Sequence, residues 1–292
     1  MWNRHVSSVL LAIFVVAGCK NASPGGGSGN YSGGGSGNYS ADLDDNPDFS
    51  EPYGRIVVQT WLEYGENSLS GAFADGPEVS MHTEDDREGN CRLLTYEPSS
   101  CEPVCTGSDL CVDGECQAWP ERQDRGDLEW TWPDGEATIS PDGLLGYSAS
   151  GSTDKGGDVS ITFEDITLVS STTEAPQPKG DLAQAMVDRG SDDAVLRWKN
   201  PVENARIRLH MTDCLGTHGG LAEAEIECEG PDTGELVIPG EYLDMLDDGD
   251  WSHGECGTHT FARYHSAAPE GDDTIRFETI GNEGLFYRPG GW

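Results

Sequence analysis

Hydrophobic and polar residues alternate one by one along much of the chain beyond residue 50. In the run 206–211, Ile207, Leu209 and Met211 fall on one side and charged residues fall on the other. The same period of two recurs at 159–163, 222–228 and 275–278. Because successive side chains of a strand point to opposite faces, this pattern indicates strands with one buried face and one polar face. We therefore predict antiparallel sheets.

Turn sequences rich in Pro, Asp and Gly separate these runs at short intervals. They occur at 133–135, 141–143, 231–234 and 248–249. Proline presets the backbone of the first turn position, and glycine accepts a positive φ. Short strands spaced in this way predict sandwiches rather than a parallel α/β sheet. Helix is predicted only at 181–189, which follows an Asp N-cap, and as a turn at 241–246.

A stretch of Ser, Thr and Pro at 170–178 is predicted to be a linker. It separates a region at 51–175 from a region at 181–292, and each is long enough to bury its own core. The first region contains a cysteine-rich knuckle at 91–118. The predicted fold class is therefore mostly β, with two antiparallel β-sandwich-like regions, a disulfide-rich knuckle and a disordered N-terminal tether.

The first residues have the composition of an export signal. An apolar run from Val9 to Val16 follows a short basic start, and it is too short to span a bilayer. The sequence Val16-Ala17-Gly18-Cys19 resembles a bacterial lipobox, which implies that 1–18 is a lipoprotein signal peptide and that Cys19 carries the lipid. Lys20 follows where an aspartate would favour the inner membrane, so we expect an outer-membrane anchor.

Residues 19–50 are predicted to form a flexible tether. The eight residues GGGSGNYS at 25–32 are repeated at 33–40. Gly/Ser-rich sequence is a random coil, and roughly thirty residues of it reach about 30 Å. The predicted location is thus the cell envelope, periplasmic or at the cell surface, with the membrane as a partner through the lipid anchor.

The chain is strongly acidic, with 53 Asp and Glu against 17 Lys and Arg and a formal net charge of −36. Nucleic-acid binding needs clustered Lys and Arg, so nucleic acid is excluded as a partner. Anionic lipid head groups are repelled as well, so the acyl chains must supply the attachment. The acidity serves solubility in a salty medium, or it forms a face for divalent cations or a basic partner.

Cysteine counting predicts four disulfides. Lipidation of Cys19 leaves eight cysteines, an even number in an exported protein. They are Cys91, Cys101, Cys105, Cys111, Cys116, Cys214, Cys228 and Cys256. Five lie in the first region and three in the second, so an odd number of bridges must join the two regions. Cys91 is the candidate for this crossing bridge.

The knuckle Cys101-x3-Cys105-x5-Cys111-x4-Cys116 is too short to bury a core, so covalent bridges must hold it. It resembles growth-factor-like (EGF-like) hairpins, and this resemblance implies the pairs Cys101–Cys111 and Cys105–Cys116. Zinc is the competing interpretation, but zinc ligand pairs usually have the spacing C-x2-C.

The run from Cys91 through the knuckle to Trp119-Pro120 resembles a recurrent element of uncharacterised secreted lipoproteins from myxobacteria and related deltaproteobacteria. Further similar stretches are 175–176, 195–198, 226–228 and 232–239. The resemblance covers most of 51–292 and implies a secreted lipoprotein. It implies no catalytic or ligand residue, because that group has no assigned activity.

Zinc and calcium are the metals whose ligand patterns this chain partly matches. Histidines and cysteines of the second region offer ligands, namely His210, Cys214, His218, His253, Cys256, His259 and His265. Against zinc, His210 shares a strand face with Arg206 and Arg208 that is predicted to be wet, whereas Cys228 points to the core. The run 244–255 partly fits a calcium loop, but Leu246 occupies a position that needs an oxygen ligand. We predict no metal and no cofactor.

Catalytic motifs are weak in this sequence. Gly146-Tyr-Ser-Ala-Ser150 approaches a nucleophile elbow but ends in serine, and phosphate-binding and dinucleotide fingerprints are lacking. Trp130 and Trp132 alternate on one strand face and are predicted to belong to the core rather than to an exposed platform. The sequence therefore predicts a non-enzymatic protein.

Together, these features predict a lipid-anchored cell-envelope protein that acts as a binding or adhesion module, with an envelope protein or a glycan as partner. A structural or assembly lipoprotein is the first alternative. A secreted hydrolase with an unrecognised site is the second, and a pocket of titratable groups with shifted pKa values would favour it.

Overall fold

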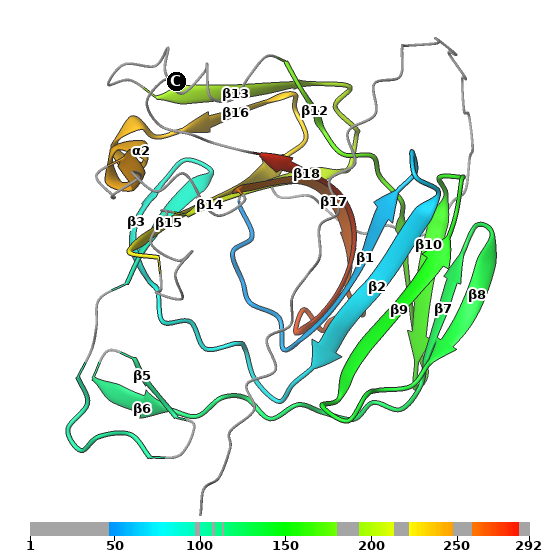
Figure 1. Cartoon of the computed structure of the whole chain (residues 1–292), viewed down its shortest axis with the longest axis horizontal. Coiled ribbons are helices and arrows are strands. Elements are labelled where there is room, and N and C mark those ends of the chain that lie inside the picture. Colours follow the sequence, from blue (N-terminus) through cyan, green and yellow to red (C-terminus); the bar gives the residue numbers. More distant parts are fainter. Residues whose placement is uncertain are drawn as a thin grey trace, which may run out of the picture. The chain divides into compact units, whose positions relative to one another are not determined.

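The computed structural model describes residues 47–96, 100–106, 109–112, 114–179, 193–212, 222–247 and 259–285. Within them the chain is mostly β (Figure 1). The predicted signal peptide, Cys19, the helix at 181–189, Cys214, Cys256 and all of the predicted tether before residue 47 lie outside the described residues. No helix among the described residues has the length and apolar character needed to cross a bilayer.

A nine-stranded sheet, here called the large sheet, forms the frame of the fold. Its order is β3 (Thr83–Glu88), β4 (Cys91–Thr95), β15 (Ala224–Pro231), β14 (Arg206–Thr212), β17 (His259–Ala267), β18 (Ile275–Leu285), β1 (Gly54–Trp61), β2 (Glu66–Phe73) and β9 (Gly146–Ser152). Neighbouring strands are antiparallel except β1 and β18, which run parallel.

Three smaller sheets complete the described structure. The four-stranded sheet has the order β11 (Ile166–Ser171), β10 (Asp158–Phe163), β7 (Leu128–Trp132) and β8 (Gly135–Ile139). The three-stranded sheet has the order β12 (Gln177–Pro178), β13 (Ala194–Lys199) and β16 (Glu235–Ile238), and the helix α2 (Gly240–Asp247) follows it in the chain. In the knuckle, β5 (Leu110–Val112) pairs with β6 (Glu115–Gln117).

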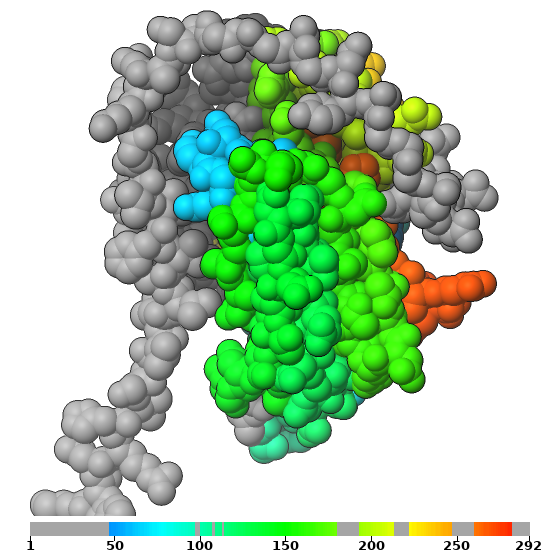
Figure 2. All heavy atoms as spheres, turned by 90° about the vertical axis from the view of Figure 1, so that its right-hand side faces the viewer, coloured from blue at the N-terminus to red at the C-terminus, as the bar shows by residue number. Residues whose placement is uncertain are grey.

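One face of the large sheet is apolar and is covered in two places (Figure 1). The first core lies between β18, β1, β2 and β9 and the four-stranded sheet, whose outer surface faces the viewer at the centre of Figure 2. The second core lies between β4, β15, β14 and β17 and the three-stranded sheet with α2. The predicted fold class, mostly β with two sandwich-like regions, is confirmed.

The predicted alternation holds at the level of side chains. Ile207, Leu209 and Met211 are buried in the second core, each at most 1% exposed. Trp130 is fully buried in the first core, and Trp132 packs against that core with its ring centroid 4.3 Å from that of Trp130. Both tryptophans therefore belong to the packing, as the strand pattern indicated.

Each core contains strands from both sides of the domain boundary that the sequence predicted near residues 175–181. Cys91 and Leu93 belong to the second core, and Ile275 and Phe277 belong to the first. The pairing of β4 with β15 and of β1 with β18 carries one continuous sheet through both cores. The two sandwich-like regions are therefore built from interleaved parts of the chain.

The segment expected to be a linker at 170–178 is packed into the fold. Ser170 and Thr173 are 1% and 5% exposed, and the Ser170 hydroxyl lies 2.9 Å from the hydroxyl of Thr279 in β18. Ser and Thr are common in loops, but they also occur in buried strands when another group forms a hydrogen bond with their hydroxyl. Here β18 supplies that partner.

Three disulfides lie among the described residues. Cys101–Cys111 and Cys105–Cys116 hold the knuckle, in the pairing implied by its resemblance to growth-factor-like hairpins. Cys91–Cys228 joins β4 to β15 and is the crossing bridge for which Cys91 was the candidate. The sulfurs of Cys101, Cys105 and Cys116 lie close together, but all three are oxidised, and a metal would need thiolates.

Candidate functional site

The second face of the large sheet carries most of the charged strand residues, and it is here called the polar face. Six of the chain's 17 Lys and Arg residues lie on it, namely Arg55, Arg87, Arg92, Arg206, Arg208 and Arg276. The carboxylates among them are Glu84, Glu225, Glu227, Glu229 and Glu278. The alternation of the strands places these side chains opposite the two cores.

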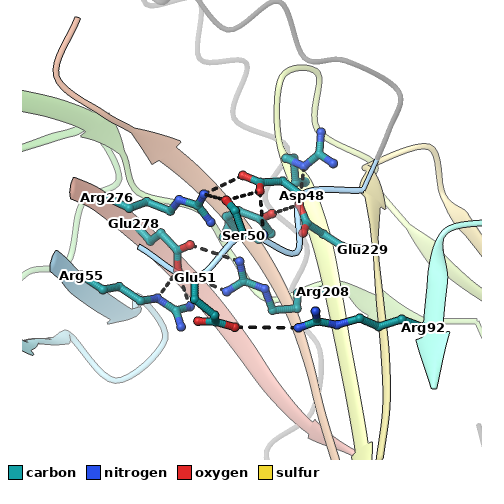
Figure 3. Close-up of polar contacts among 11 residues, drawn as sticks. Asp48, Ser50, Glu51, Arg55, Arg92, Arg208, Glu229, Arg276 and Glu278 are labelled. Carbon is teal, nitrogen blue, oxygen red and sulfur yellow. Dashed lines mark hydrogen bonds and ion pairs between the residues drawn. The ribbon is translucent and has the colours of Figure 1, made fainter. Parts of the chain in front are cut away.

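Glu278 is the centre of the polar face, with a fully buried side chain (Figure 3). Its Oε2 accepts hydrogen bonds from Arg55 Nε at 3.0 Å and Nη2 at 2.5 Å. Arg208 donates from Nη2 to Oε1 at 3.1 Å and from Nη1 to Oε2 at 3.2 Å. Burial by itself would raise the pKa of Glu278, but the charges and hydrogen bonds of Arg208 and Arg55 lower it to about 2.

A second buried group lies beside it on β14, β15 and β17. Arg206 Nε donates to Glu229 Oε1 at 2.7 Å, and the Tyr264 hydroxyl donates to the same oxygen. The Tyr264 ring also stacks under the guanidinium of Arg208, 4.4 Å from its centroid. Burial raises the pKa of Tyr264, and the neighbouring Glu229 carboxylate raises it further. The tyrosine therefore stays neutral and donates.

At the β4 end, Glu225 lies between two histidines. His210 Nε2 is 3.3 Å from Glu225 Oε2, and His82 Nε2 is 3.6 Å from Oε1. Burial would lower the pKa of His210, but the hydrogen bond and charge of Glu225 outweigh burial and raise it. Next to this group, Arg92 donates from Nε to Glu227 Oε2 at 2.7 Å.

The face of β14 that carries Arg206, Arg208 and His210 is less wet than the sequence indicated. Arg206 is only 7% exposed, and the side chain of Arg208 is 26% exposed. The correction has a physical reason, because neighbouring strands supply a carboxylate for each cation and the paired groups then tolerate burial.

Residues 47–53 also cover part of the polar face (Figure 3). Arg276 Nη2 donates to Asp48 Oδ2 at 2.6 Å and to Ser50 Oγ at 2.9 Å. The Phe49 ring lies under the guanidinium of Arg92, 4.6 Å from it. Burial would raise the pKa of Asp48, but hydrogen bonds from Ser50 and the charge of Arg276 lower it. The last residues assigned to the tether, 48–50, are thus already docked on the sheet.

Beyond β1 the polar face becomes rich in serine, and Glu66 is the one charged residue that β2 and β9 place on it. Ser70 of β2 lies opposite Ser148 of β9, and Ser68 lies opposite Ser150. Ser70, Ser148 and Ser150 are exposed, and Ser68 is half-buried. Ser148 and Ser150, from the weak nucleophile motif, therefore lie within a strand and not at a strand-to-helix elbow.

The structure separates the described histidines that could have shared a metal. His265 points to the opposite face from His210, because the two occupy opposite parities on β17 and β14. Its Nδ1 lies 3.1 Å from the carbonyl oxygen of Asn204. Cys214, His218, His253 and Cys256 lie outside the described residues. Leu246, from the weak calcium motif, is buried in α2, and the motif from residue 248 onward is outside the described residues.

Around Glu278 the chemistry of the polar face favours fixed charges over proton transfer, whereas at the β4 end Glu225 raises the pKa of His210 from its ordinary value. The pKa values of Glu278 and Asp48 are lowered, and the pKa of Tyr264 is raised. A general acid or base needs a pKa near the working pH, and these shifts move away from neutrality. Among the described residues, the arrangement is therefore a preorganised array of ion pairs and hydroxyls.

Sequence reasoning missed this array, although one signal was visible. Three polar positions of β14 read Arg, Arg and His, and three of its hairpin partner β15 read Glu, Glu and Glu. Opposite charges on facing strands predict cross-strand pairs. The contribution of Arg55 and Glu278 has no such local signal, since the two residues lie 223 positions apart in the sequence.

Comparison with known proteins adds little to this picture. No family model matches the chain, and no curated protein matches it. A solved structure described as a Ca²⁺-stabilized adhesin that helps an Antarctic bacterium reach out and bind ice is similar at a TM-score of 0.18 and 9% identity. The match covers 82% of this chain and 50% of that one, so this chain spans about half of its length. A TM-score this low does not indicate a shared fold.

Proposed function

We propose that this protein is a lipid-anchored binding module of the cell envelope that works without catalysis and recognises an envelope partner through its polar face. The observation that carries the proposal is the buried Arg55–Glu278–Arg208 group. It holds opposite charges in fixed positions, with a pKa for Glu278 far below neutral pH. Preorganised charges give binding specificity without needing a titrating group.

Charge distribution also supports recognition at this face. The chain as a whole is acidic, yet its arginines gather on the polar face, where Arg55 keeps 41% of its side chain exposed. The exposed serines of β2 and β9 extend the face with groups that both donate and accept hydrogen bonds. A partner with its own mixture of charges and hydroxyls suits this surface.

Binding to whole cells tests the recognition surface. We expect the purified mature protein, fluorescently labelled, to bind saturably to envelope-intact cells of its own species that lack the gene. Arg55→Gln leaves Glu278 paired with Arg208, and Ser70→Glu adds bulk and a negative charge to the serine-rich part, so both should fold and bind at least about fivefold more weakly. Added salt should weaken wild-type binding too, because exposed charges are screened.

Matched controls lie on the outer face of the four-stranded sheet. Glu136 and Thr138 are exposed on β8, and Glu136→Gln and Thr138→Glu should leave binding unchanged. Equal losses in the control and polar-face variants, or no saturable binding, would contradict the proposal.

The lipid anchor needs a separate measurement. Mass spectrometry of the protein purified from its own membranes should find acyl mass on Cys19 as the first residue. Cys19→Ala should release the protein into the soluble envelope fraction, because the acyl chains supply the attachment. A wild-type protein that starts elsewhere and carries no acyl mass would contradict the anchor.

A further inference from the structure

Residues 47–52, here called the cover segment, lie on the polar face just before β1 begins (Figure 3). They form neither helix nor strand. Among the described residues, no backbone hydrogen bond joins them to the sheet, and the first such bond runs from Tyr53 N to the carbonyl oxygen of Thr274. Asp48 and Glu51 keep 48% and 51% of their side chains exposed. Ion pairs of such exposed groups contribute little to stability, so a competing ligand can displace the cover segment.

Arg276 depends on the cover segment for its partners. Its Nη2 donates to Asp48 Oδ2 at 2.6 Å and to Ser50 Oγ at 2.9 Å. No other described residue forms a hydrogen bond or ion pair with this guanidinium, although the Arg276 side chain is only 9% exposed. Its neighbour on β1 is Arg55, a second cation, and Glu278 is already held by two other arginines. Without the cover segment, Arg276 needs a carboxylate from elsewhere.

An aromatic ring is the second group that this surface accepts. The Phe49 ring lies under the guanidinium groups of Arg92 and Arg87, whose centres are 4.6 Å and 5.0 Å from the ring centroid. Guanidinium groups stack favourably on aromatic faces. Next in the chain, Glu51 Oε1 lies 3.8 Å from Arg92 Nη2. The surface therefore receives an acid, a ring, a hydroxyl and an acid from four consecutive residues.

The charge of the chain makes this surface distinctive. Its net charge of −36 repels acidic ligands in general, whereas six of its 17 Lys and Arg residues gather on the polar face. Pro47 and Pro52 flank the four contacting residues, and a proline favours extended backbone in the residue before it. The cover segment thus shows which ligand fits these arginines, namely an extended acidic segment with an aromatic residue.

We propose that Arg87, Arg92 and Arg276 form a docking site for an extended acidic segment, with an aromatic residue, of another envelope protein. Residues 48–51 occupy this site until the partner displaces them. The inference rests on the proposed binding role of the polar face, and it names the chemical class of the partner and its internal competitor. Because the partner binds only after the cover segment leaves, the cover segment lowers the apparent affinity for the partner.

Peptide binding followed by NMR of the full mature protein tests the site. The triple substitution Asp48→Asn, Phe49→Ser and Ser50→Ala, here called the released variant, removes the contacts of the cover segment and keeps the three arginines. The probe is a synthetic peptide with the sequence of residues 47–52 and blocked ends. It is titrated to about 5 mM, because a segment on a short linker has an effective concentration in the millimolar range. We expect the released variant to bind it at least about tenfold more tightly than the wild type.

A control peptide carries Asn and Ser in place of the Asp and Phe of the probe, and it should not bind. No binding of the probe by the released variant would overturn the site. Equal binding of the two peptides, or equal binding of the probe by the wild type and the released variant, would overturn it as well.

Substitutions of arginine locate the bound peptide. Arg276→Gln, added to the released variant, should abolish binding because it removes the cation that receives the acid. Arg87→Gln lies at an exposed position and is a second test that should fold, and it should weaken binding about threefold through the lost ring contact. Arg197→Gln on β13 is the matched control, with 55% of its side chain exposed, and it should bind like the released variant. Equal effects of all three substitutions would overturn the site.

Whole cells test the partner. The released variant should bind envelope-intact cells at least about fivefold more tightly than the wild type, and protease treatment of the cells should remove this gain. A gain that survives the protease would overturn a protein partner. A mixture of wild type and released variant should stay monomeric in analytical ultracentrifugation. Dimers would show that the cover segment of a second copy fills the site, and they would overturn the assignment to another protein.

The two proposals fail in different ways. Saturable cell binding that the released variant does not increase leaves the proposed function standing and removes this inference. Peptide binding that needs Arg276, without cell binding by either protein, supports the docking site and contradicts the proposed function.

Discussion

Glu278 shows how a buried charge is kept ionised in this protein. Two arginines from different strands, Arg55 of β1 and Arg208 of β14, converge on one carboxylate that is fully buried. A buried ion pair need not stabilise a protein more than apolar packing would, because burying charges costs hydration. Removing one partner is different, since it leaves the other charges uncompensated.

We therefore predict that Glu278→Gln lowers the free energy of unfolding by about 3 kcal/mol at neutral pH. The native pKa of about 2 lies below the ordinary value of 4.5, so the stabilisation by Glu278 is fully present above pH 4.5. It is lost as the pH falls from 4.5 toward 2. Urea unfolding of both proteins between pH 7 and pH 2 should show the gap between them closing over that window.

Glu136→Gln on the exposed face of β8 is the control, and it should follow the wild type at every pH. A gap between Glu278→Gln and the wild type that stays constant down to pH 2 would mean that the charge of Glu278 does not stabilise the fold.

At the scale of elements, β18 organises the molecule. It pairs with β1 on one side and β17 on the other, and its residues face the first core, the polar face and the crossing segment at 173–175. Gly281 is the point of closest approach. A Cβ there would lie 2.4 Å from the carbonyl carbon of Glu174 and 2.6 Å from the backbone nitrogen of Ala175.

Gly281→Ala should therefore destabilise the protein by about 3 kcal/mol, because backbone atoms cannot move aside as a flexible side chain would. The matched change is Gly143→Ala, where nothing lies within 4 Å of the added Cβ, and it should leave the melting temperature nearly unchanged. Thermal unfolding followed by circular dichroism measures both. Equal melting temperatures for the two variants would show that the segment at 173–175 does not press on β18.

At the scale of the whole molecule, the disulfide Cys91–Cys228 closes the longest covalent loop among the described residues. It spans 137 positions, whereas the knuckle bridges span 10 and 11. Because a crosslink removes more freedom from the unfolded chain when its loop is longer, the three bridges should differ in their effect on stability.

Replacing Cys91 and Cys228 by alanine should cost about 5 kcal/mol by the loop-entropy relation, against about 3 kcal/mol for Cys105 and Cys116. The first change should also weaken both cores together, since β4 and β15 belong to the sheet that runs through them. Calorimetry of the two double variants tests this. A larger loss for the knuckle variant would reverse the expected order.

How far the sequence predicts this protein depends on the distance over which each feature is encoded. The strand at 206–211 was predictable because the alternation of apolar and polar residues is visible within those six residues alone. The knuckle pairs were predicted from the resemblance of the closely spaced cysteines to growth-factor-like hairpins. A bridge between the two regions was predicted because each region contains an odd number of cysteines. The candidate site was predictable only as a hairpin of opposite charges on β14 and β15.

The sequence by itself determined the β class, the faces of the strands, the oxidised knuckle and the acidity, because each depends on neighbours in the chain or on composition. Only the tertiary structure decided that β1 lies beside β18, that Arg55 reaches Glu278 and that the segment at 173–175 packs over Gly281. The physical reason is that pairing between distant strands depends on the packing of the whole sheet, and local alternation is compatible with many such pairings.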